Sequence, residues 1–105
     1  MSSERATTTG ILTYLRSQGI WAFKVHGSPM QEAGVPDIVA CWEGRFLSIE
    51  VKAPTGRLSK LQGVQLCRIA QAGGVAVVAH SVDEVKDLLT QLKEQAYHKP
   101  SSSSG

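Results

Sequence analysis

The chain has 105 residues, of which 42% are hydrophobic, and this length fits a single domain with one modest core. Its formal net charge is +2, from 11 basic and 9 acidic residues, so total charge does not by itself indicate nucleic-acid binding, which depends on clustered charge. No apolar stretch reaches transmembrane length and no signal-peptide pattern is present, so we expect a soluble cytoplasmic protein.

The two cysteines, Cys41 and Cys67, stand apart from each other and lack the paired spacing of a zinc site. We expect both to be reduced thiols in the core. Residues 1–96 carry the helix and strand patterns and are expected to form one domain. Residues 97–105 include a serine run and offer little that could pack, so we expect a disordered tail.

The first helix is predicted over residues 3–18. Ile11 and Leu15 recur at helical spacing, and Gly19 stands where a left-handed C-terminal cap is favoured. Glu4 lies nearly in line with these apolar residues, so its carboxylate could reach a site at the inner end of the helix. It could equally be solvated at the positive end of the helix dipole. The sequence leaves both interpretations open.

A half-buried strand is predicted over residues 20–26, because apolar side chains alternate along it with others. We assign Trp21 to the core face of this strand. Lys24 and His26 belong to the opposite face, where they could contact a phosphate or simply be solvated. The second tryptophan, Trp42, is expected in the core or at a dimer surface.

Residues 27–35 contain two glycines and one proline without any periodicity, and they predict a loop. The loop comes immediately before Asp37, so we expect it at the rim of any site that this residue helps to form. It could close over a bound strand or be an ordinary connector. Ser28 in this loop is kept as a candidate phosphate contact.

Residues 36–52 are predicted to form two apolar strands joined by a tight turn at Gly44, which supplies a positive φ. Asp37, Glu50 and Lys52 are charged residues within this run, where burying a charge is costly unless it has a partner. Side chains alternate along a strand, so Glu50 and Lys52 project from one face. The turn brings Asp37 alongside them. Two carboxylates and one ammonium group therefore meet at one end of the hairpin.

The two carboxylates and the lysine together indicate metal-assisted hydrolysis of a phosphodiester. Two converging carboxylates suit a hard cation such as Mg²⁺, which takes oxygen ligands and keeps several waters. A lysine beside them could contact a phosphate. Together they are typical of phosphodiester hydrolysis, in which a metal lowers the pKa of water and stabilises charge on the phosphate oxygens.

A second helix is predicted over residues 59–72, which are followed by two glycines. Ser59 and Gln62 fit a capping box. Gln62 is also in line with the apolar stripe expected to face the sheet, and we favour a role in the site, expecting that one amide cannot serve both. Arg57 and Lys60 flank the helix start, where backbone N–H groups favour an anion, and they are candidate phosphate contacts.

The remaining pattern predicts a buried strand over residues 75–79 and a final amphipathic helix. Ser81 is expected to cap this helix, and Glu84 to complete a second capping box. The resulting order is helix, strand, strand, strand, helix, strand, helix. It predicts a three-layer α/β domain with a mixed sheet and an open hairpin end.

Two groups of residues carry a resemblance to a known family. Pro36-Asp37 followed by Glu50-Val51-Lys52 resembles the PD-(D/E)xK nuclease signature. Gly34, together with residues 58–62, makes the VRR-NUC branch the most similar one, particularly its small stand-alone members. Archaeal Holliday-junction resolvases are similar in size and layout. The resemblance implies the restriction-endonuclease-like αβββαβ core, a mixed central sheet flanked by helices.

The resemblance implies a metal-dependent DNA endonuclease. Asp37 and Glu50 would bind Mg²⁺ or Mn²⁺, and Lys52 would orient the attacking water and stabilise developing charge. The implied catalytic and metal-binding set is Glu4, Asp37, Glu50, the Val51 backbone carbonyl, Lys52 and Gln62. The candidate DNA contacts are Lys24, His26, Ser28, Arg57 and Lys60. A homodimer acting on branched DNA, such as four-way junctions, is also implied. The cytoplasm that we expect is that of a bacterial or phage-infected cell.

Two alternatives belong to other classes of protein. The first is a nuclease-fold DNA-binding module with little or no turnover, against which the presence of all three signature residues argues. The second is a sugar or nucleotide enzyme with a chance motif. That interpretation would make the order of the elements and the position of Gln62 coincidences as well.

Overall fold

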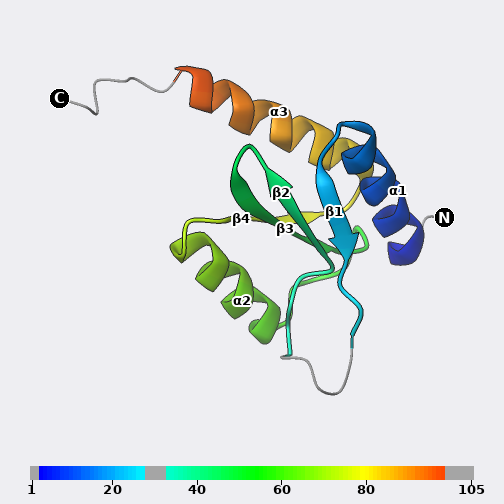
Figure 1. The fold of residues 1–105 in the computed structure, drawn as a ribbon. Coiled ribbons are helices and arrows are strands. Elements are labelled where there is room, and N and C mark those ends of the chain that lie inside the picture. The colour runs from blue at the N-terminus through cyan, green and yellow to red at the C-terminus, as the bar shows by residue number, and fades with distance from the viewer. Residues whose placement is uncertain (1–2, 28–32, 99–105) are drawn as a thin grey trace.

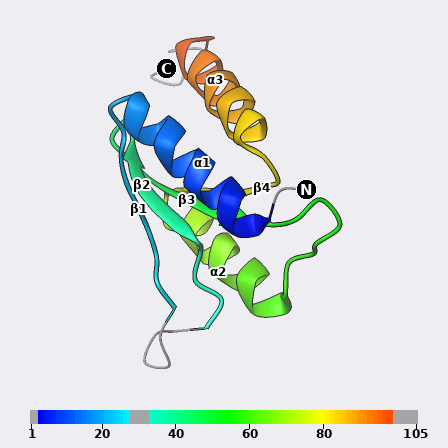
Figure 2. The same ribbon diagram turned by 90° about the vertical axis from the view of Figure 1, so that its right-hand side faces the viewer.

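The computed structural model describes residues 3–27 and 33–98, and it shows a mixed sheet between two layers of helices (Figure 1). The elements in chain order are α1 (Glu4–Ser17), β1 (Trp21–Lys24), β2 (Ile38–Trp42), β3 (Arg45–Val51), α2 (Lys60–Gln71), β4 (Val75–Ala79) and α3 (Val82–His98). This order confirms the α/β architecture predicted from the sequence. Figure 2 shows α1 and α3 on one side of the sheet and α2 on the other.

The four strands lie in the order β1-β2-β3-β4. The first three are antiparallel neighbours, whereas β3 and β4 are parallel and are connected through α2. A parallel pair needs a long crossover connection, which a helix supplies. β3 therefore lies inside the sheet with a partner on each side, and its last residues are among the most buried in the chain.

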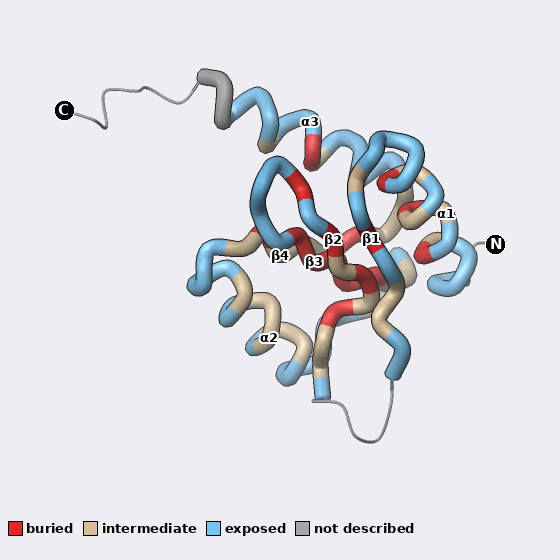
Figure 3. Tube along the Cα trace, in the orientation of Figure 1, coloured by how far each residue is buried: buried red, intermediate tan, exposed pale blue. Residues whose placement is uncertain are grey.

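The hydrophobic core lies between the sheet and the helix pair α1 and α3. Ala22, Ala40 and Leu47 pair across three strands and so share one face. Ile11 and Leu15 of α1 are fully buried against this face. Figure 3 shows the buried positions gathered in the strands and on the inner sides of these helices. The 3.6-residue periodicity of α1 and α3 is thus explained by one shared core.

The β2–β3 hairpin forms as the sequence predicts. Trp42 pairs with Arg45 across a two-residue turn in which Glu43 has φ 50° and Gly44 has φ 75°. Two consecutive positive φ values are the geometry that matches the twist of the flanking strands. Trp42 is 8% exposed and belongs to the core. The turn fixes the register that carries Asp37 to the far end of β3.

The predicted burial of β1 is wrong. Trp21 is 65% exposed and Phe23 is 44% exposed, whereas Ala22 between them is buried. The reason is that α1 packs on the Ala22 face, while α2 packs mainly on β4 and leaves the Trp21 face of β1 open. Alternation located the strand, but it did not identify the covered face.

The cysteines and the chain end also differ from expectation. Cys41 and Cys67 are both exposed, so the prediction of core thiols is wrong. Cys41 shares its face of the sheet with Trp21, and Cys67 lies on a helix that has no buried residue. α3 continues to His98, two residues into the range expected as a tail, and residues 99–105 lie outside the described residues.

At the starts of α1 and α3, side-chain oxygens accept hydrogen bonds from backbone N–H groups that have no partner within the helix. The Ser3 hydroxyl accepts a hydrogen bond from the Ala6 N–H, as an N-cap does. At α3 the Ser81 hydroxyl accepts from the Glu84 N–H, but the Glu84 carboxylate accepts from the N–H of His80 and not of Ser81. The second capping box is therefore shifted by one residue. None of the described helices is long and apolar enough to cross a membrane.

Replacing Leu15 by alanine should destabilise the fold. Leu15 is fully buried between α1 and the sheet, and its truncation leaves a cavity. We expect the free energy of unfolding to fall by about 2–4 kcal/mol. Urea denaturation measures this loss, with Thr9→Ala at an exposed position of α1 as the control. Equal stability of the two variants would contradict the assigned core.

Candidate active site

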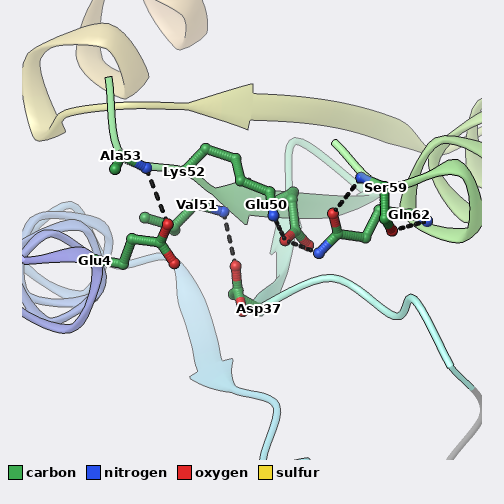
Figure 4. Close-up of polar contacts among 8 residues, drawn as sticks. All are labelled: Glu4, Asp37, Glu50, Val51, Lys52, Ala53, Ser59 and Gln62. Carbon is green, nitrogen blue, oxygen red and sulfur yellow. Dashed lines mark hydrogen bonds and ion pairs between the residues drawn. The ribbon is translucent and has the colours of Figure 1, made fainter. Parts of the chain in front are cut away.

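Four segments converge at the end of β3 where the chain leaves the sheet (Figure 4). They are the start of α1, the residue before β2, the end of β3 and the first turn of α2. Asp37, Glu50 and Lys52 lie together here, as the hairpin geometry predicts. Glu4 and Gln62 approach the same place from the two helices.

Asp37 is tied to β3 through both its backbone and its side chain. Its N–H donates to the Ile49 carbonyl at 3.1 Å, and its Oδ2 accepts from the Val51 N–H at 2.8 Å. The carboxylate is therefore fixed beside the last residue of β3. The N–H and C=O of a strand residue lie on the same edge, so the Val51 carbonyl also faces the β2 side.

Glu50 is the buried charge of the site. Its side chain is 3% exposed, and its Oε2 accepts a hydrogen bond of 2.7 Å from the Gln62 Nε2 and lies 3.8 Å from the Lys52 Nζ. Its Oε1 is buried and has no hydrogen-bond partner among the described residues. An unpaired buried carboxylate oxygen is costly unless something absent from the bare protein satisfies it.

The electrostatics show that this cluster is short of positive charge. Burial, together with the nearby charge of Asp37, raises the pKa of Glu50 from 4.5 to about 7, and Glu4 adds to the increase. The Lys52 ammonium lowers the pKa of Glu50 but does not outweigh the other groups. A divalent cation would supply the missing charge, and carboxylate oxygens are the donors that Mg²⁺ and Mn²⁺ accept. The donor set therefore fits such an ion.

Gln62 serves the helix cap and the site at once. Its Oε1 accepts from the Ser59 N–H at 2.8 Å, completing the capping box with the Ser59 hydroxyl. Its Nε2 donates to Glu50 at the same time. The expectation that one amide cannot do both is wrong, because the oxygen and the nitrogen of the amide point to different partners. The cap thus orients the hydrogen bond to Glu50.

The start of α2 is in turn held by the segment before β2. Gly34 has φ +82°, and a Cβ there would lie 2.8 Å from the carbonyl atoms of Leu61. The Gln65 side chain donates to the Ala33 carbonyl at 3.2 Å. Sequence reasoning used Gly34 only as part of a motif and missed this packing role. A glycine facing a helix start has no distinct signal in one sequence.

Glu4 lies beside the cluster on α1. Its carboxylate accepts from the Ala53 N–H at 3.1 Å, one residue beyond Lys52. Across residues 3–27 and 33–98, however, no three His, Cys, Asp or Glu side chains come together as a ligand group. The geometry therefore offers a pair of carboxylates, and the role of Glu4 as a metal ligand stays a prediction.

The described candidate DNA contacts lie at the end of β1 and at the start of α2. Lys24 ends β1 opposite Ile38 and is partly buried, and His26 follows as an exposed residue. Arg57 and Lys60 are exposed on either side of the α2 N-cap. Ser28 lies outside the described residues. Contacts of these residues with DNA stay predictions.

Replacing Glu50 by glutamine should stabilise the metal-free protein above neutral pH. The pKa of Glu50 is about 7 in the folded state against 4.5 ordinarily, so the wild type loses stability as pH rises between these values. Below both values the carboxyl is protonated in either state and the loss vanishes. We expect Glu50→Gln to gain about 1–3 kcal/mol near pH 8.

Urea denaturation in the presence of a chelator, near pH 8 and again near pH 4, measures this gain. Glu94→Gln at an exposed position of α3 is the matched control and should change little at either pH. A Glu50→Gln gain of the same size at both pH values would contradict the electrostatic cause.

Comparison with known proteins identifies the family to which this domain is similar. The family model described as the VRR-NUC domain matches residues 14–83. No curated protein sequence matches the chain. A solved VRR-NUC domain is similar with a TM-score of 0.72 at 20% identity, covering 86% of this chain and 97% of its own. A second VRR-NUC domain protein gives a TM-score of 0.64 at 21% identity, covering 87% and 88%.

A third similar structure is Hjc, a Holliday junction resolvase from the archaeon Archaeoglobus fulgidus. It is 32% identical with a TM-score of 0.57, covering 71% of this chain and 65% of Hjc. The two VRR-NUC structures are too distant in sequence to show more than the fold. The family match, in contrast, spans most of the chain and includes every residue from Asp37 to Gln62. The chain therefore belongs to the VRR-NUC family of nuclease domains.

Proposed function

We propose that this protein is a metal-dependent DNA endonuclease that hydrolyses phosphodiester bonds in branched DNA. The observation that carries the proposal is the Glu50 carboxylate. It is buried, its Oε1 has no partner among the described residues, and it lies beside Asp37 and Lys52. A site that serves only to support the fold has no use for such a group.

Asp37 and Glu50 would hold Mg²⁺ or Mn²⁺, with the Val51 carbonyl as a third oxygen donor. Such an ion, when bound, lowers the pKa of water and stabilises charge on the oxygens of a phosphate. The protein positions its own donors in advance. Asp37 is fixed by the Val51 N–H and Glu50 by the Gln62 amide, which leaves the Glu50 Oε1 free to bind.

Lys52 supplies the second positive charge of the proposed reaction. Its side chain is 16% exposed and its Nζ lies 3.8 Å from the Glu50 Oε2, so the side chain is neither fully solvated nor fully buried. In this position it would orient the attacking water and stabilise negative charge that develops on the phosphate. Lys52 follows Glu50 by two residues and comes directly after the last residue of β3.

Branched DNA is proposed as the substrate because the resolvase Hjc is 32% identical to this chain. A four-way junction has two equivalent strands to cut. A two-fold symmetric dimer presents two identical sites to two such strands, so a homodimer belongs to the proposal. The basic residues Lys24, Arg57 and Lys60 would then contact the DNA backbone.

Replacing Lys52 by alanine should abolish cleavage while junction binding is retained. We expect the cleavage rate to fall by about 100-fold or more, because removal of one preorganised charge has effects of this size. Single-turnover cleavage and gel-shift binding of the same junction measure the two properties. Lys93→Ala, a lysine on α3, is the matched control. Unchanged cleavage by Lys52→Ala would refute its assigned role.

The substrate class is tested with labelled linear duplex, flapped, single-stranded and four-way-junction DNA in Mg²⁺, Mn²⁺ or chelator. We expect metal-dependent cuts at symmetric positions of the junction, all lost in Glu50→Ala because the ion loses a ligand. Metal-dependent cutting of the other substrates alone would overturn the branched-DNA assignment. Binding without cutting on every substrate would identify a DNA-binding module without turnover.

A further inference from the structure

An aromatic strip lies exposed on the sheet face opposite the core. We define it as Trp21 and Phe23 of β1, Cys41 of β2 and Phe46 of β3. Trp21 pairs with Cys41, which pairs with Phe46, so these side chains project from one face. Trp21 is 65%, Phe23 44% and Phe46 49% exposed. The Trp21 and Phe23 rings pack edge to face at 5.2 Å.

The fold itself leaves this strip uncovered. α1 and α3 pack on the opposite face of the sheet, and α2 lies over β4 (Figure 2). The described part of the chain therefore provides no element to cover the strip.

The size of the strip matches part of a stable interface. At these exposed fractions its three aromatic side chains present roughly 300–400 Å². A stable dimer buries about 800 Å² on each partner, with an apolar centre in which aromatic residues are enriched and charges are depleted. The strip supplies such a centre.

We propose that the aromatic strip is the two-fold interface through which two copies of this chain associate. The proposal specifies the homodimer of the proposed function and rests on it. None of the strip side chains is charged, so the same surface can meet itself without like-charge repulsion. A DNA backbone would instead call for basic groups, and the guanidinium of Arg45 at the start of β3 is engaged with the Gly73 carbonyl.

The position of the strip leaves the catalytic end accessible. Phe46 precedes Glu50 by four residues on β3, which corresponds to about 13 Å along the strand. Trp21 lies at the start of β1. Asp37 lies near the other end of that strand, where its backbone carbonyl accepts a hydrogen bond from the Val25 N–H. Phe23 is the strip residue nearest the site, because it pairs with Val39, two residues from Asp37. A partner centred on Trp21 and Phe46 therefore need not cover the carboxylates.

Cys41 provides a direct probe of the covered surface. It lies within the strip, and Cys67 on α2 is a second exposed thiol outside it. We expect the modification rate of Cys41 by a maleimide to fall by about tenfold when most of the chain is dimeric, whereas Cys67 reacts unchanged. Measuring each rate at low and high protein concentration uses the wild-type chain and depends on no variant. Equal, concentration-independent rates at the two thiols would overturn the proposal.

Sedimentation equilibrium with Trp21→Glu provides the second measurement. Trp21 is already mostly exposed, so the substitution should leave the fold intact and raise the dimer dissociation constant by about 100-fold. Gln91→Glu, on an exposed position of α3, makes the same charge change outside the strip and should leave dimerisation unchanged. A wild-type monomer at all concentrations, or a dimer insensitive to Trp21→Glu, would refute the interface.

The outcomes separate this proposal from the nuclease itself. A monomer that cuts DNA with Mg²⁺ would refute the interface and keep the nuclease. A dimer that is disrupted by Trp21→Glu but cuts no DNA would keep the interface and refute the nuclease. A wild-type monomer in which Trp21→Glu weakens DNA binding would assign the strip to nucleic acid, against the proposal.

Discussion

The burial of the Glu50 carboxylate is the constraint on which the site depends. β3 runs inside the sheet, so a charge near its end is removed from water and becomes costly. Gln62 and Lys52 offset part of this cost through one carboxylate oxygen, and the other oxygen stays unpaired. The strand that gives the domain its core thus also carries a buried carboxylate oxygen that a bound cation would satisfy.

The remaining elements act by fixing the groups around this carboxylate. The β2–β3 turn sets the register that places Asp37 against Val51. The cap of α2 aims the Gln62 amide at Glu50, and Gly34 allows the preceding segment to pack closely on the helix start. Asp37 is therefore held by the Val51 backbone N–H, and Glu50 by the side chain of the capping residue Gln62, before any ligand arrives. Such preorganisation is what electrostatic catalysis requires.

The sequence was sufficient for the features that depend on local pattern. It predicted the order of elements, the turn at Gly44 and the meeting of Asp37 with Glu50, because periodicity and turn chemistry determine them. The prediction failed where packing against another helix or strand determines which side chains are buried or in contact. Alternation along β1 could not tell that α1 would cover Ala22 rather than Trp21. The double role of Gln62 required the positions of both Ser59 and Glu50, which only the folded chain relates.

Calorimetric titration of the wild type with Mn²⁺ tests most directly whether Glu50 and Asp37 form a cation site. When the titration is run near pH 7 in buffers of different ionisation enthalpy, it also measures the number of protons released on binding. Because the pKa of Glu50 is about 7, binding should release a fraction of a proton, and Glu50→Gln should abolish both uptake and release. Mn²⁺ binding that survives in Glu50→Gln, or no binding by the wild type, would contradict the account.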